Sequence, residues 1–127
     1  MDRQCIFSGS KWEKIAAYSR AIRVGNIIEV AGTTAVDGDK LIGKGDPAAQ
    51  AKFIIEKIGR ALEGLGGSLK NVTRTTIYVT DISNWEQVAR VHGEFFEGIT
   101  PASTLIGVSG LIDPELLVEI AVTAVLN

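Results

Sequence analysis

The sequence predicts an α+β fold in which one mixed β-sheet carries two helices on one of its faces. Two segments, 46–67 and 83–98, place apolar residues at helical spacing between residues that cap helices. The segment 116–122 is apolar on both alternating faces, which is typical of a buried strand. Extended segments precede, separate and follow the helical ones, so we expect some parallel strand pairs with right-handed connections through the helices.

The composition is that of a folded domain without a basic surface. The 127 residues are expected to form one domain, 1–127, and 46% of them are hydrophobic, which argues against disorder. Such an apolar share in a small chain with several strands favours oligomerisation, because extra apolar faces need partners. The net charge of −2, without a cluster of Lys or Arg, speaks against nucleic acid or a membrane as a partner.

Cysteine usage and the apolar runs indicate the compartment. Cys5 is the only cysteine, so an internal disulfide is impossible, which fits a reducing compartment. The first residues lack an apolar signal core, and no apolar run is long enough to cross a bilayer. We therefore expect a cytoplasmic protein.

The first third of the chain predicts extended structure. Residues 3–8 are expected to form a short strand, and residues 17–24 alternate as a second one. Gly25-Asn26 is a turn signal, and 27–33 is the next extended run, so these two strands should form a hairpin. Gly32 inside the last strand indicates either a bulge or the close approach of another backbone or a ligand.

The first long helix is predicted to begin after Asp46, a good N-cap, with Pro47 at the first helical position. Gly66-Gly67 supplies its C-terminal stop. Upstream, the turn at 37–39 leads to a brief edge strand at 41–44. The apolar stripe of the helix consists of Ala51, Ile54, Ile55, Ile58, Leu62 and Leu65.

The second helix follows the β-rich segment 72–82. Ser83 and Glu86 have the spacing of a capping box, and Gly98 is the expected stop. A strand at 103–108 and a turn at 110–114 then lead to the final strand. The predicted buried stripe of the helix consists of Trp85, Val88, Val91 or His92, Phe95 and Ile99.

Glu119 is the candidate functional residue of the final strand. At a period of two its neighbours are Leu117 and Ala121, so it lies in an apolar row. Desolvation there should raise its pKa and make it a proton carrier near neutral pH. The alternative is a carboxylate at the rim of the sheet or paired with an arginine.

The sequence lacks the residues that a metal site, a phosphate-binding loop or a dinucleotide-binding site requires. His92 is the only histidine and has no further ligand at metal-binding spacing, and no phosphate-binding or dinucleotide-binding glycine motif follows a strand. What remains is Glu119, the phenol of Tyr18, and hydroxyls from Thr33, Ser103 and Thr104. A carboxylate can deprotonate water and a phenol can donate to a developing charge, so this set suits the attack of one water on an electrophilic small molecule. Neither a metal nor a cofactor is required.

A set of motifs runs through the chain from about residue 12 to residue 126. They are Ala17-Tyr18-Ser19-Arg20-Ala21, Val24-Gly25-Asn26, Val30-Ala31-Gly32-Thr33, Gln50, residues 72–81, Phe95-Phe96, Pro101-Ala102 and Leu117-Val118-Glu119-Ile120. Together they are specific, and the chain resembles the Rid/YjgF family, also called the YER057c/UK114 family. The resemblance implies a chorismate-mutase-like fold, a homotrimer with a central barrel, and clefts between its subunits. It also implies hydrolysis of reactive enamines or imines, such as 2-aminoacrylate, to a ketoacid and ammonia.

The resemblance carries over to individual residues only in part. Glu119 matches the glutamate that holds the attacking water, and Tyr18 matches the tyrosine at the cleft. Gly32 and Thr33 stand where the family has a glycine and a polar residue at the cleft wall. The family's second-helix asparagine is replaced by Ala89, and a cysteine near the site by Leu105.

Ser103 is the most consequential departure, because the deaminases of the family carry there an arginine that grips the substrate carboxylate. A serine hydroxyl cannot replace a bidentate, charged contact, whose loss of about 1.5–3 kcal/mol weakens binding roughly tenfold to a hundredfold. The substrate is therefore expected to differ from 2-aminoacrylate. Strand alternation would place Arg20 on the side of Tyr18, where it could supply a substitute cation.

Two functions remain open at this point. One is a hydrolytic enamine or imine deaminase with an altered substrate, which Glu119 and Tyr18 favour. The other is a non-catalytic trimer that binds a small metabolite in the same cleft, which Ser103 favours. A ribonuclease role, suggested for some relatives, is disfavoured by the acidic balance of the chain.

Overall fold

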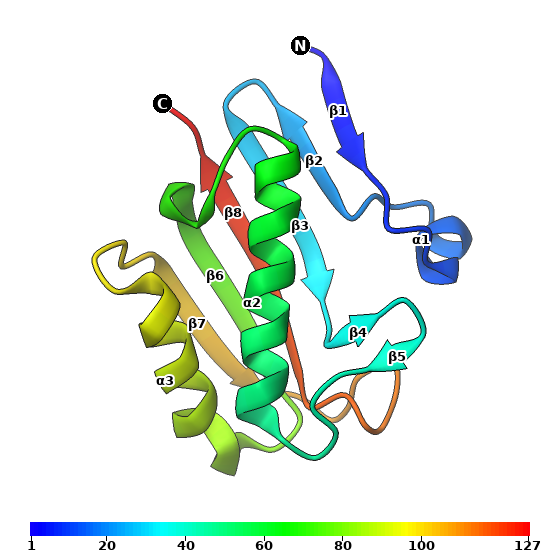
Figure 1. The fold of residues 1–127 in the computed structure, drawn as a ribbon, viewed down its shortest axis with the longest axis vertical. Helices are drawn as coiled ribbons and strands as arrows, with labels where there is room; N and C mark the ends of the chain where they lie inside the picture. The colour runs from blue at the N-terminus through cyan, green and yellow to red at the C-terminus, as the bar shows by residue number, and fades with distance from the viewer.

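The computed structural model describes residues 1–127. Its main element is a six-stranded sheet with the strand order β1-β2-β3-β8-β6-β7 (Figure 1). Only β6 and β7 run parallel, and the other neighbours are antiparallel. The predicted mixed sheet of an α+β fold is confirmed. The strands are β1 (Arg3–Ile6), β2 (Ala21–Val24), β3 (Ile27–Thr33), β6 (Val72–Val79), β7 (Ala102–Gly107) and β8 (Val118–Val125).

The first hairpin forms as predicted, but its first strand is shorter than expected. Gly25 takes a positive φ of 60° in the turn between β2 and β3, a conformation that glycine adopts without steric cost. The prediction of a strand over 17–24 is wrong for its first residues. A short helix, α1 (Lys11–Ala16), stops at Ala17 in the left-handed conformation, and Ser10 caps its start through a hydrogen bond from the Trp12 N–H.

The helix α2 (Pro47–Gly64) begins and ends where the sequence predicts. Asp46 Oδ1 accepts a hydrogen bond of 3.1 Å from the N–H of Ala49, and Gly66 reverses the chain with a φ of 88°. Ahead of it, β4 (Val36–Asp37) and β5 (Lys40–Leu41) form a separate hairpin, so the edge strand expected at 41–44 begins one residue earlier and is shorter.

The second helix, α3 (Trp85–Phe96), starts differently from the prediction. Ser83 donates to Asp81 through its N–H and its hydroxyl within a 3₁₀ turn, η2 (Ile82–Asn84), so it forms no capping box. Trp85 is 53% exposed, whereas Phe96, absent from the predicted stripe, is buried with Val88. The rest of the predicted stripe is confirmed, because Val88 is in the core and Val91, Phe95 and Ile99 pack against it. A second 3₁₀ turn, η1 (Leu69–Asn71), precedes β6.

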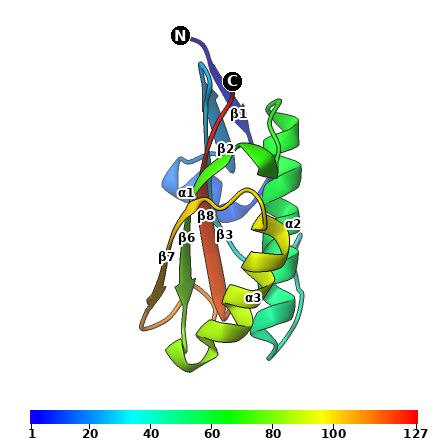
Figure 2. The ribbon, with the colours of Figure 1, turned by 90° about the vertical axis from the view of Figure 1, so that its left-hand side faces the viewer.

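Both long helices cover the same face of the sheet, as expected (Figure 2). The core is one cluster of 19 buried residues, which includes Ile54 and Ile58 of α2 and Ile120 and Val122 of β8. The opposite face of the sheet carries no long helix and keeps apolar side chains in solvent. Those that are exposed include Ile27, Ile106 and Val125. No helix in the structure is long and apolar enough to span a bilayer.

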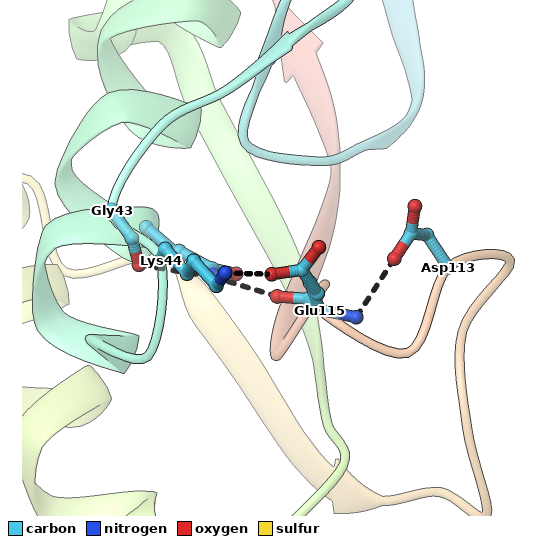
Figure 3. A network of polar contacts seen from close by, with 5 residues as sticks. Gly43, Lys44, Asp113 and Glu115 are labelled. Carbon is cyan, nitrogen blue, oxygen red and sulfur yellow. Dashed lines mark hydrogen bonds and ion pairs between the residues drawn. The ribbon is translucent and has the colours of Figure 1, made fainter.

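Gln50 of α2 fixes the entry into β8. Its fully buried amide donates to the carbonyl oxygens of Gly43 and Glu115 at 3.2 and 3.0 Å, and its Oε1 accepts from the N–H of Leu117 at 2.8 Å. Figure 3 shows Lys44 reaching Glu115 in an ion pair of 3.2 Å, beside the bond from the Glu115 N–H to Asp113. The buried amide therefore anchors Leu117, the residue just ahead of β8 and two before Glu119.

Candidate functional site

Glu119 points to the face of the sheet that the long helices leave open. Its neighbours Val118 and Ile120 are buried toward the core, and strand alternation turns Glu119 the other way. It lies opposite Tyr78 of β6, in the antiparallel pair of β8 and β6. The side chain is half-buried even within one chain.

The backbone of Gly32 lies close to the Glu119 carboxyl group across the pair of β3 and β8. A β-carbon on Gly32 would lie 2.9 Å from Cδ of Glu119, closer than real β-carbons come to another atom. The register between β3 and β8 also shifts between Val30 and Thr33. Both sequence interpretations of Gly32, a bulge and a close approach, therefore hold at once.

Burial raises the pKa of the Glu119 carboxyl above its ordinary value, and the positive charge of Arg20 partly opposes this shift. The predicted direction is confirmed. The acidic partners of the ion pairs in the chain are Glu86 and Glu115, so the carboxylate of Glu119 is not neutralised by a direct pair. A desolvated carboxylate without a salt bridge is suited to accept and return a proton.

Arg20 lies beside this carboxylate and is fixed by backbone contacts. Its Nη2 donates to the carbonyl oxygen of Gly32 at 2.7 Å, and its own backbone joins Ile6 and Ala31. Its Nε–H is buried and has no partner in the chain, which is uncommon for a buried donor. Residues 17–20 form no strand, so the alternation argument for Arg20 was wrong, yet its guanidinium lies 5.9 Å from the centre of the Tyr18 ring.

Tyr18 is 37% exposed and lines a surface hollow of about 410 Å³ beside α1, together with Phe7 and Ser19. Glu119, Gly32, Arg20 and Tyr18 are thus linked through successive neighbours. Thr33 is not open to a ligand in the single chain, because it is 1% exposed and donates its hydroxyl to the carbonyl oxygen of Ala31 at 2.8 Å.

Ser103 and Thr104 lie apart from Glu119, on the edge strand β7, which β6 separates from β8. Ser103 is exposed and faces the helix side of the sheet, where its hydroxyl bonds to that of Thr75. Thr104 points to the other side and accepts a bond of 2.9 Å from Arg74. One chain therefore does not bring Ser103 and Glu119 together.

The structure adds three residues that the sequence reasoning did not connect to a site. Thr75 bonds to both Ser103 and His92, and the imidazole of His92 is half-buried. Lys57 of α2 donates to the carbonyl oxygen of Val36, and burial followed by the charge of Arg20 lowers its pKa. No sequence signal marks these contacts, since they depend on strand register and helix placement. No group of three or more His, Cys, Asp or Glu side chains is placed to hold a metal ion.

The chain is similar in sequence and in fold to several known proteins. The family model described as endoribonuclease L-PSP matches residues 9–126. The chain is 42% identical to the crystal structure of Rv2704 from Mycobacterium tuberculosis, a member of the YjgF/YER057c/UK114 family; the TM-score is 0.89, and the match covers 98% of this chain and 100% of the other. A RutC family protein of Pyrococcus abyssi is 36% identical over 125 residues, which is 98% of each chain. A Rid family protein from Yersinia pestis is 29% identical, with a TM-score of 0.86 and coverage of 98% and 100%.

Proposed function

The chain belongs to the YjgF/YER057c/UK114 family, also called Rid, and from this premise we propose that it hydrolyses small reactive imines and enamines. The observation that carries the proposal is the Glu119 carboxylate, which is desolvated, lacks a direct ion pair and lies on the backbone of Gly32. Such a group can hold one water and remove its proton. We place this activity in the cytoplasm, as the single cysteine suggests.

The proposed reaction consumes one water and releases ammonia. An enamine first takes a proton on carbon and loses one from nitrogen, which converts it to the imine. Glu119 accepts a proton from water as the oxygen bonds to the imine carbon, and the C=N electron pair moves to nitrogen, which takes the proton back. Glu119 then takes the hydroxyl proton of the carbinolamine and delivers it to the nitrogen, so the C–N electron pair leaves with ammonia and the oxygen forms the C=O bond of the carbonyl product. In this proposal Tyr18 donates a hydrogen bond to the charge that develops during these steps.

We further propose that the working site lies between copies of the chain in a homotrimer. Ser103 and Glu119 face opposite sides of one sheet, so a cleft that contains both needs β7 from one subunit and β8 from another. The apolar side chains on the open face support such an assembly, since association would remove them from water. In this arrangement the sheets of the subunits would line a central barrel and the helices would lie outside.

A binder without catalysis is the second candidate, because Ser103 replaces a charged anchor with a hydroxyl. Ribonuclease activity, which the family description names, has less support, since the net charge is −2 and the backbone of RNA requires cationic contacts.

One experiment separates the three functions. Imines would be generated from a panel of amino acids and amines with the corresponding oxidases, and ammonia release compared with and without this protein. Faster release for at least one imine supports the deaminase. No acceleration, together with calorimetric binding of a carbonyl product, supports the binder, and cleavage of single-stranded RNA under the same conditions supports the nuclease.

A further inference from the structure

Three side chains from separate elements form a hydrogen-bonded chain at the edge of the sheet. Thr75 Oγ1 lies 2.8 Å from Ser103 Oγ and 2.9 Å from His92 Nε2. Thr75 and Ser103 face each other in the parallel pair of β6 and β7, and His92 reaches them from α3. The ring of His92 packs at a tilt of 38° against Phe96, with centroids 4.6 Å apart, which restricts its orientation.

The hydrogen-bonded series of Ser103, Thr75 and His92 connects the protein surface with the interior. Ser103 is exposed, Thr75 is 0% exposed and His92 is half-buried. Because Thr75 has a single hydroxyl proton, it can donate to only one of its two partners. If His92 Nε2 accepts from Thr75, Ser103 donates inward and presents lone pairs to the solvent. If Nε2 carries the proton, the chain reverses and Ser103 presents its own O–H outward.

The side chains of Ser103, Thr75 and His92 carry no charge at neutral pH. Burial lowers the pKa of the His92 imidazole, which favours its neutral form. The arginines of neighbouring elements are engaged elsewhere: Arg74 binds Thr104, whose side chain is on the opposite face, and Arg90 pairs with Glu86 on the outer surface of α3. Ser103 is thus held as an adaptable, uncharged hydrogen-bonding group.

We propose that Ser103, oriented by Thr75 and His92, binds an uncharged carbonyl or amide group of the substrate, and that the substrate is an imine or enamine without a carboxylate at this position. The inference rests on the proposed function, which brings Ser103 into the cleft. A carboxylate beside Ser103 would face the uncharged hydrogen-bonded series of Ser103, Thr75 and His92, which we call the relay. Within one chain the charge of Arg20 acts on the carboxylate of Glu119, and no cation bonds to Ser103. Thr75 and His92 are positioning residues in this assignment.

The test uses stable product analogues, so it does not depend on turnover. Pyruvamide and pyruvate differ only in an amide against a carboxylate, and their affinities would be measured by calorimetry. We expect tighter binding of pyruvamide. Ser103→Ala and Thr75→Val should each weaken it about threefold to tenfold, the loss of one hydrogen bond between neutral groups. Thr75→Ser keeps the hydroxyl and should restore the affinity, while Ser103→Arg should reverse the preference toward pyruvate.

The nitrogen resonances of His92 provide a measurement that ligand binding would leave unchanged if His92 had only a structural role. It is the only histidine, so its imidazole gives one set of nitrogen resonances that report which ring nitrogen carries the proton. Pyruvamide should shift these resonances in the wild type and in Thr75→Ser, but not in Thr75→Val. Unchanged resonances at saturating pyruvamide would overturn the relay.

The outcomes separate this inference from the proposed function. Binding of pyruvamide that depends on Ser103, without hydrolysis of any imine, supports the relay and removes the deaminase. Hydrolysis of carboxylated imines, with pyruvate bound more tightly than pyruvamide and no effect of Ser103→Ala, keeps the deaminase and overturns the relay. Binding of neither analogue also overturns it.

Discussion

The carboxyl group of Glu119 lies directly on the backbone of Gly32, where a β-carbon would approach the carboxyl carbon to 2.9 Å. The two residues come from β8 and β3, whose register shifts at this point. The contact has two effects. It removes water from one side of the carboxylate, which raises its pKa, and a side chain at position 32 would have to displace the carboxylate. Gly32 thereby becomes part of the site without contributing a side chain.

Gly32→Ala should therefore lower activity more than stability. The methyl group would push the Glu119 carboxylate out of its position, and we expect kcat to fall about tenfold or more, since small misplacements of a catalytic group cost about that much. Overpacking should lower the free energy of unfolding by about 1–3 kcal/mol. Gly93→Ala is the matched control, because no atom lies within 4 Å of its added β-carbon. Equal activity of Gly32→Ala and Gly93→Ala would rule out this role of Gly32.

Glu119→Gln should stabilise the fold at neutral pH. The pKa of Glu119 is higher in the folded than in the unfolded state, so the folded state binds more protons and loses stability as pH rises between those two values. Glutamine resembles the neutral carboxyl and avoids this loss. Denaturant unfolding at constant protein concentration should show the variant more stable than wild type at neutral pH, with a smaller difference below the ordinary pKa of 4.5. A variant less stable than wild type at neutral pH would contradict this sign.

Arg20→Gln should move the acidic limb of the activity profile to higher pH. The charge of Arg20 lowers the pKa of Glu119, so removing that charge lets burial raise the pKa further, and deprotonation of the base requires a higher pH. Arg20→Lys keeps the charge and should leave the limb closer to that of the wild type. The measurement is kcat/KM against pH for the three proteins, and coincident limbs for all of them would refute the coupling.

Arg20 was also considered as a substitute cation for a substrate carboxylate, and that role stays a prediction. Arg20→Ala should then reduce activity only on carboxylated imines. Full activity of this variant on such a substrate would exclude the role.

Local signals predicted most of the fold, and competition between local hydrogen bonds accounts for the misplaced start of α3. Helix α2 follows from Asp46, Pro47 and Gly66, whose effects act within one turn. The start of α3 was misjudged because Asp81, ahead of the supposed capping box, binds Ser83 instead. The capping box and the bonds to Asp81 both join residues that are close in the sequence, and the conformation of the folded backbone decides which of them forms.

The sequence predicted two features of the candidate site. The apolar row of Glu119 on the final strand predicted its raised pKa, and Gly32 inside a strand predicted a bulge or a close approach. The approach of Gly32 depends on the irregular pairing of β3 with β8, and the relay of Ser103 and Thr75 depends on the register of a parallel pair. No spacing within the sequence encodes such a register.

The open face of the sheet should be the surface through which the subunits associate. Ala121 lies half-buried on this face, two residues from Glu119 on β8. Ala121→Arg would place a charge among apolar side chains and should convert a trimer to smaller species. Gln87→Arg, on the exposed surface of α3, is the control and should leave the assembly intact. Sedimentation of the wild type at the mass of one chain would contradict the trimer.

The most direct test of the central claim is ammonia release from an imine that the wild-type protein hydrolyses, measured in parallel with Glu119→Gln. The account predicts that Glu119→Gln folds and assembles like the wild type but loses about a hundredfold or more in kcat, as expected when a general base is removed. A Glu119→Gln protein that releases ammonia as fast as the wild type would contradict the account.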